Sequence, residues 1–134
     1  MGVVTTSDRR HRPERGEDII EFALILPLLL VLLLGVMEFG FAVMRYNTIA
    51  NAAREGARAG IVSGATDAAI INAAKNLTTG LTEGDLDIIV NRPTARSVQV
   101  EVIYEHHFIT TPIIVAVGGD GTLTMRTVST MNIE

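Results

Sequence analysis

The chain has 134 residues, 48% of them hydrophobic, which suits one small domain joined to one membrane segment rather than two globular domains. It has no cysteine, which excludes disulfide bonds and thiolate metal sites, and its net charge is −4. Residues 1–16 carry four arginines against two acids, so the strongly acidic remainder lacks the clustered Lys and Arg that phosphate contacts need, and nucleic-acid binding is excluded.

The most apolar segment comes first in chain order. Phe22 to Met37 contains no charge and would span about 24 Å as a helix, and continuing to Met44 gives about 34 Å. That length crosses a hydrocarbon core of about 30 Å with some tilt, and Glu38 would lie near the far interface. Arginines before the segment and an acidic domain after it predict a cytoplasmic N-terminus, a span over about 22–44 and an extracytoplasmic remainder.

A secretory signal peptide is the competing interpretation of a basic start followed by an apolar run. Here Glu17, Asp18 and Glu21 stand between the arginines and the apolar run, and no small-x-small site closes the run. These features disfavour cleavage on its far side.

Helical periodicity continues past the membrane, which predicts one helix over 17–60. Pro27 should kink this helix or interrupt its hydrogen bonding near Ala23. Small residues at this spacing either admit another subunit's backbone or make room for the protein's own sheet, and both interpretations stay open. The predicted inner face comprises Ile49, Ala52, Ala53, Gly56, Ala57 and Gly60.

Residues 61–134 predict an extracytoplasmic domain. A short amphipathic helix is expected over 65–77, with Ala69, Ile70, Ala73, Ala74 and Leu77 inward. Alternating apolar residues predict strands over 86–90, 98–104 and 122–131, with Arg92–Thr94 as the first turn. The stretch 109–117 is either a hydrophobic loop or a fourth strand, and Ile113, Ile114 and Val115 are either core or an exposed patch. The predicted fold is α+β, with a small antiparallel sheet of three or four strands following the transmembrane helix.

No constellation in the chain predicts catalysis. His106 and His107 are adjacent, so in a strand they point to opposite faces and do not suit one metal ion. Gly118–Gly121 lacks the Lys-Ser/Thr of a phosphate loop and the spaced acids of a calcium loop, which favours a hairpin turn. No serine lies in a nucleophile elbow. We expect neither an enzyme nor a bound cofactor or metal.

The acids beside the apolar run raise a separate question. Negative charge in a helix's first turn offsets the positive end of the dipole, which explains Glu17 and Asp18. Glu21 lies one turn further in, where burying a carboxylate in a bilayer costs about 2.5 to 3.5 kcal/mol or more. A partner for Glu21 is therefore expected.

Residues Gly16 to Phe22, GEDIIEF, resemble the processing motif of type IV pilin precursors, in particular those of the Tad (Flp) pilus. The following EFALILPLLLVLLLGVMEFG and YNTIANAAREGARAG are similar to the TadE-like family of pilin-related proteins. The detailed likeness covers about Arg15 to Gly60. Beyond it, only a short β-rich region ending in Thr122–Glu134 is shared in general terms.

The resemblance implies that a prepilin peptidase cleaves between Gly16 and Glu17 and removes residues 1–16 as a leader peptide. It also implies that Glu21, next to Phe22, aligns the subunit with the positive N-terminus of a neighbour. Helix packing in the fibre would involve Pro27, Ala53, Gly56, Ala57 and Gly60. The implied partners are the peptidase, other pilin subunits, the inner-membrane assembly platform and, before assembly, membrane lipid.

The function implied is a structural subunit that leaves the cytoplasmic membrane for an extracellular pilus used in adhesion or motility. Tad major pilins are often very short, so the domain over 61–134 favours a minor pilin or pseudopilin. The alternative is an uncleaved single-pass envelope protein whose external domain binds a partner.

Overall fold

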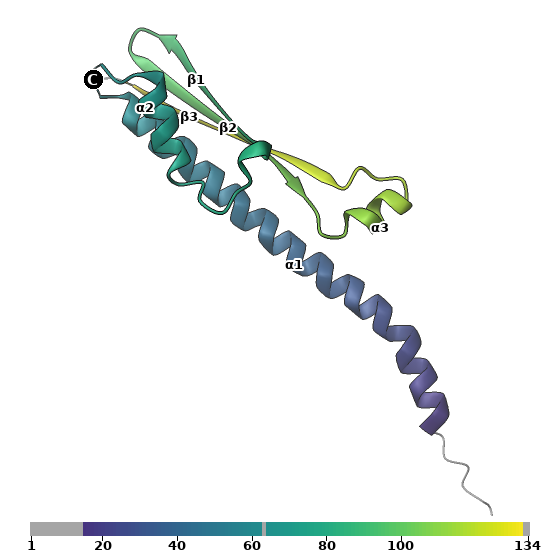
Figure 1. The fold of residues 1–134 in the computed structure, drawn as a ribbon. Coiled ribbons are helices and arrows are strands. Elements are labelled where there is room, and N and C mark those ends of the chain that lie inside the picture. Colours follow the sequence, from purple (N-terminus) through teal and green to yellow (C-terminus); the bar gives the residue numbers. More distant parts are fainter. Residues whose placement is uncertain (1–14, 63, 133–134) are drawn as a thin grey trace, which may run out of the picture. The chain divides into compact units, whose positions relative to one another are not determined.

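The structure, a computed structural model, describes residues 15–62 and 64–132. The chain divides into two compact units, Met1–Leu34 and Gly35–Glu134. Helix α1 (Arg15–Gly60) contributes to both units (Figure 1). Of the predicted leader, all but the last two residues lie outside the part of the chain that is described.

The described part of the first unit is the N-terminal portion of α1, over 15–34. Glu17 and Asp18 occupy its first turn, where they offset the helix dipole, and Pro27 lies inside the helix without ending it. The single long helix predicted over 17–60 is therefore confirmed. Apolar side chains are exposed at almost every position of this portion: Ile19, Ile20, Phe22, Leu24, Ile25, Leu28, Leu29, Leu30, Val31, Leu32 and Leu33.

The second unit contains one antiparallel sheet in the order β1-β2-β3. Its strands are β1 (Leu86–Thr94), β2 (Ser97–His107) and β3 (Thr122–Asn132), and a 3-10 turn, η1 (Glu83–Asp85), leads into β1. Val100 on β2 lies opposite Val90 on β1 and Ser129 on β3. Side chains alternate between the two faces along each strand, and these three residues share the inner face of the sheet. The α+β fold with a three-stranded sheet confirms the predicted fold class.

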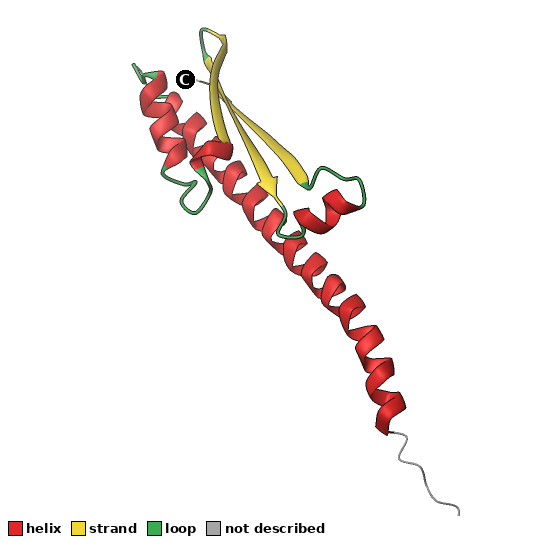
Figure 2. Cartoon of the chain, turned by 45° about the vertical axis from the view of Figure 1, so that its right-hand side comes forward, coloured by secondary structure: helices red, strands yellow, loops and turns green. Residues whose placement is uncertain are grey.

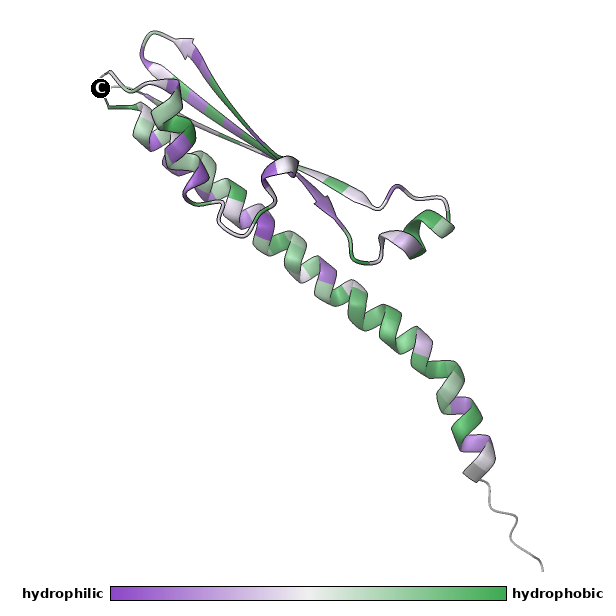
Figure 3. Cartoon of the chain, viewed as in Figure 1, coloured by the Kyte–Doolittle hydropathy of each residue, from purple (hydrophilic) through white to green (hydrophobic). Residues whose placement is uncertain are grey.

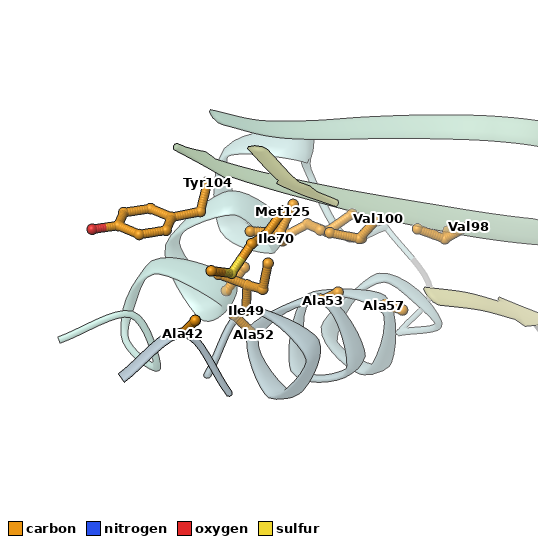
Figure 4. Packing of buried hydrophobic residues seen from close by; sticks show 12 residues of the cluster. Ala42, Ile49, Ala52, Ala53, Ala57, Ile70, Val98, Val100, Tyr104 and Met125 are labelled. Atoms are coloured by element: carbon orange, nitrogen blue, oxygen red, sulfur yellow. The ribbon is translucent and has the colours of Figure 1, made fainter. Parts of the chain in front are cut away.

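Helices cover one face of this sheet. The C-terminal portion of α1 and the short helix α2 (Asp67–Lys75) lie on the same side of it (Figure 2). Alanines on α1 keep the helix close to the valines of β2, and Ile70 of α2 fills the space beside them (Figure 4). The core consists of Ala42, Ile49, Ala52, Ala53, Ala57, Ile70, Ala74, Val98, Val100, Val102, Tyr104 and Met125.

Helix α2 is shorter than predicted. Thr66 caps its start by accepting a hydrogen bond from the Ala69 backbone N–H at 3.3 Å. Ile70 and Ala74 are buried as expected, whereas the predicted inward positions of Ala69 and Leu77 are wrong, because both are exposed. Ile70 and Ala74, one helical turn apart, are the buried residues of α2. The helix ends at Lys75, so the helical period no longer sets the direction of Leu77.

The predicted turn at Arg92–Thr94 is also wrong, because β1 continues through these residues and the chain reverses at 95–96. Pro93 has no N–H to donate, but it is tolerated because β1 is an edge strand. Arg92 binds the start of α2, donating to the Ala65 carbonyl at 2.9 Å and to Asp67 Oδ1 at 3.0 Å. Side-chain contacts to α2 thus favour extending the strand over turning early.

The ambiguous stretch 109–117 holds a helix, α3 (Thr111–Ala116), rather than a loop or a fourth strand. Pro112 favours a helix start, and Gly118 ends the helix at a φ of 92°, a left-handed conformation that favours glycine. Gly118–Gly121 is therefore the turn from α3 into β3 and does not join two strands directly. Ile113 and Val115 are exposed and Ile114 is half-buried, so this stretch is a surface patch rather than core.

Candidate functional site

The predicted processing site lies in the first turn of α1, where Gly16 and Glu17 are both exposed. A Cβ added to Gly16 would meet no described atom within 4 Å, so the described packing does not require glycine at this position. Glycine in a helix is less favourable than alanine by about 1 kcal/mol. A glycine without a packing role is expected where an outside partner, such as a protease, needs a bare backbone.

Glu21 lies one turn further along α1 and is exposed, as is its neighbour Phe22. Within residues 15–62 and 64–132, no side chain forms an ion pair with the Glu21 carboxylate. Pro27 is exposed in the same unit. Glu21, Phe22 and Pro27 are therefore exposed within the described part of the first unit.

The small-residue face of α1 has a different surrounding. A Cβ on Gly56 would lie 3.1 Å from the side chains of Ala74 and Val100, and one on Gly60 would lie 2.6 Å from Val98 Cγ1. Of the two interpretations left open by the sequence, the structure shows these residues making room for the protein's own α2 and β2. The buried members of the face are Ile49, Ala52, Ala53, Gly56, Ala57 and Gly60.

Sequence reasoning gave Glu38 no partner, but the structure provides one. Glu38 is 6% exposed, and both of its carboxylate oxygens accept hydrogen bonds from Thr110. The Thr110 backbone N–H donates to Oε1 at 2.7 Å and its hydroxyl donates to Oε2 at 2.6 Å. Glu38 is the single charged residue in the stretch 22–44. An acid inside an apolar segment usually has a partner, so the sequence could have predicted one for Glu38. This pair attaches the β2–α3 connection to α1.

The apolar helix that follows the acidic start of α1 is the part of the chain that matches a known family. The model of the TadE-like protein family matches residues 16–58. Residues 16–58 are TadE-like. The resemblance is thereby confirmed for this segment, and it indicates a protein associated with a Tad pilus. No curated protein and no solved structure matches the chain.

The TadE-like segment covers nearly all of Gly16–Gly60, a helix long and apolar enough to cross a membrane. The segment contains Gly16, Glu21 and Pro27 together with the small-residue face up to Ala57. Gly60 and residues 61–134 lie outside it. The match covers these positions without testing the role predicted for each, and it says nothing of the sheet domain.

Arg45 of the TadE-like segment reaches the sheet. Its guanidinium donates a hydrogen bond to His106 Nδ1, and it lies 5.9 Å from the centre of the Tyr104 ring, within cation–π distance. Burial, followed by the charge of Arg45, holds the pKa of His106 below its usual value, although Glu38 acts in the opposite direction. His106 therefore stays neutral at pH 7 and serves to join β2 to α1.

His107 faces away from this cluster. It is exposed and lies 3.5 Å from Asp85 Oδ1, while His106 is buried, so the two histidines occupy opposite faces as predicted. Among the residues that the structure describes, no three His, Asp or Glu side chains are grouped as metal ligands would be. His106 and Arg45 contact each other within the domain and join β2 to α1.

Proposed function

We propose that the protein is a structural subunit of a Tad-type pilus, processed between Gly16 and Glu17 and assembled through α1. The observation that carries the proposal is the TadE-like match over a helix whose apolar side chains are exposed. Such a surface needs lipid before assembly and other helices afterwards. The role is structural rather than enzymatic.

Assembly would exchange one apolar surrounding for another. The subunit waits in the cytoplasmic membrane with its N-terminus inside, and a prepilin peptidase frees the amine of Glu17. Glu21 then pairs with the positive N-terminus of a neighbouring subunit, which compensates for burying its carboxylate. The other proposed partners are further pilin subunits and the assembly platform in the inner membrane.

The sheet domain favours a minor pilin or pseudopilin over a major pilin. Residues 61–134 build α2 and the whole sheet and so add a folded surface that a short major pilin lacks. In a fibre, the domain would face water, where it can contact surfaces or cells in adhesion or motility. An uncleaved single-pass envelope protein is the alternative that the following experiment separates.

The test is N-terminal sequencing and intact-mass analysis of the protein from membranes and from sheared surface material. A start at Glu17 in the sheared fraction is expected, and Gly16→Ala should slow processing markedly. The matched control is Gly40→Ala, a helical glycine where an added Cβ also meets nothing within 4 Å. An intact Met1 found solely in the membrane would refute the proposal and support the uncleaved alternative.

A further inference from the structure

Helix α3 and its flanks form an apolar surface with no evident use in the soluble part of the protein. Ile109 is 63% exposed and Val117 is 81% exposed, with Ile113 and Val115 also exposed between them. Hydrophobic residues make up part of α3 in the hydropathy colouring of Figure 3. No charged residue occurs over 109–119, in contrast to the flanking strands. Large apolar side chains gathered on a helix this short call for a covering partner.

The position of α3 along α1 is set by Glu38. Thr110, the residue just before α3, donates both of its hydrogen bonds to the Glu38 carboxylate. In a helix rising 1.5 Å per residue, Glu38 lies about 9 Å before Met44, the predicted end of the membrane span. The start of α3 is therefore held beside the last third of the predicted membrane span.

The portion of α1 in the same unit has the same apolar character. Its exposed side chains are Val36, Met37, Phe39, Phe41, Val43, Met44 and Tyr46. An open groove of about 240 Å³ beside them is lined by residues of α1 and by Leu123 and Met125 of β3. Glu38 and Arg45, the charged residues of this part of α1, both engage partners within the unit. Both charged groups are thus hydrogen-bonded within the unit, and the exposed side chains around them are apolar.

We propose that α3 lies in the membrane interface of the leaflet facing the sheet domain, with Ile109, Ile113 and Val117 against acyl chains. Lipid is favoured over a second copy because the Glu38 contact holds α3 at the depth where α1 itself meets the bilayer. An isolated helix of this length would bind lipid weakly. Because α3 is linked to α1, which is already in the membrane, its binding is intramolecular and the entropy cost of bringing it to the lipid is small. Before assembly, the protein is then held by two membrane contacts, and α3 covers the carboxylate of Glu38 from lipid.

The chain contains no tryptophan, so single-tryptophan variants report depth directly. The full chain is reconstituted into phosphatidylcholine vesicles whose acyl chains carry bromine, and quenching is compared at four positions. Ile113→Trp probes α3, and Val128→Trp is the matched control, because Val128 is 44% exposed against 50% for Ile113. Leu30→Trp reports the membrane span itself. Val117→Trp repeats the probe outside the helix in case Ile113→Trp fails to fold.

The expected result is quenching of the Ile113→Trp and Val117→Trp variants approaching that of Leu30→Trp, with blue-shifted emission, while Val128→Trp stays unquenched. Quenching at both α3 positions no greater than at Val128 overturns the proposal. Emission that shifts with protein density but not with brominated lipid also overturns it, in favour of a second copy. Loss of quenching at Leu30 would overturn membrane insertion and the proposed function with it.

Discussion

Replacing Gly60 by alanine tests whether the small-residue face of α1 packs inside the subunit. The new Cβ would lie 2.6 Å from Val98 Cγ1, closer than real Cβ atoms approach another carbon, and 3.1 Å from Ile70 Cδ1, which is a tight contact. Val98 cannot rotate away easily, because it is β-branched and fully buried on the central strand. Overpacking costs about 1–3 kcal/mol, and the better helix propensity of alanine returns at most about 1 kcal/mol at this final helix position. We expect a net destabilisation of about 1–2 kcal/mol.

Thermal unfolding of the full chain in detergent micelles, followed by the fluorescence of the two tyrosines, the buried Tyr104 and the exposed Tyr46, measures this change. A loss of that size lowers Tm by roughly 5–15 °C in a domain of about 100 residues. Gly40→Ala is the matched control, since a Cβ there meets nothing within 4 Å. Equal stability of the two variants would refute the packing argument and return the small-residue face to contacts between subunits.

Three further predictions concern the contacts of α1. Glu38→Ala removes two hydrogen bonds to a carboxylate and should lower the free energy of unfolding by about 2 kcal/mol. Hydrogen exchange at the Thr110 amide should accelerate, and an unchanged exchange rate would contradict the role of this contact. Since burial lowers the pKa of His106 in the folded state, the unfolded chain binds more protons below about pH 6.5, so stability should fall as the pH is lowered through that range. Urea titrations across pH should lose part of this slope in His106→Gln and retain it in His107→Gln. Glu21→Ala should still be processed but assemble poorly, and normal amounts in sheared fibres would refute its role in registration.

Much of the fold could be predicted because the relevant signals are local. The period of 3.6 residues along α1 predicted the face that is buried, from Ile49 to Gly60. The period of two predicted β2 from its alternating valines and β3 from Leu123, Met125 and Thr127 on one face. The motif over Gly16–Phe22 likewise depends on adjacent residues, so the resemblance to TadE-like proteins was visible before any tertiary structure.

Short apolar stretches were less predictable. Residues 109–117 contain too few turns to separate a helix from a strand by periodicity, and Pro112 and Gly118 decided the outcome through local backbone geometry. Helix α2 ended early at Lys75, and β1 continued past Pro93 because it is an edge strand. Neither edge position nor helix length is visible in the residues themselves.

The sequence alone determined the long apolar helix, its acidic start and the small face on its second half. Only the tertiary structure decided what covers that face and which residue donates hydrogen bonds to the buried carboxylate of Glu38. Thr110 lies 72 residues from Glu38, and His106 lies 61 residues from Arg45. Such partners are chosen by how β2 and α3 pack beside α1, since a carboxylate or an imidazole binds whichever group the fold brings within reach.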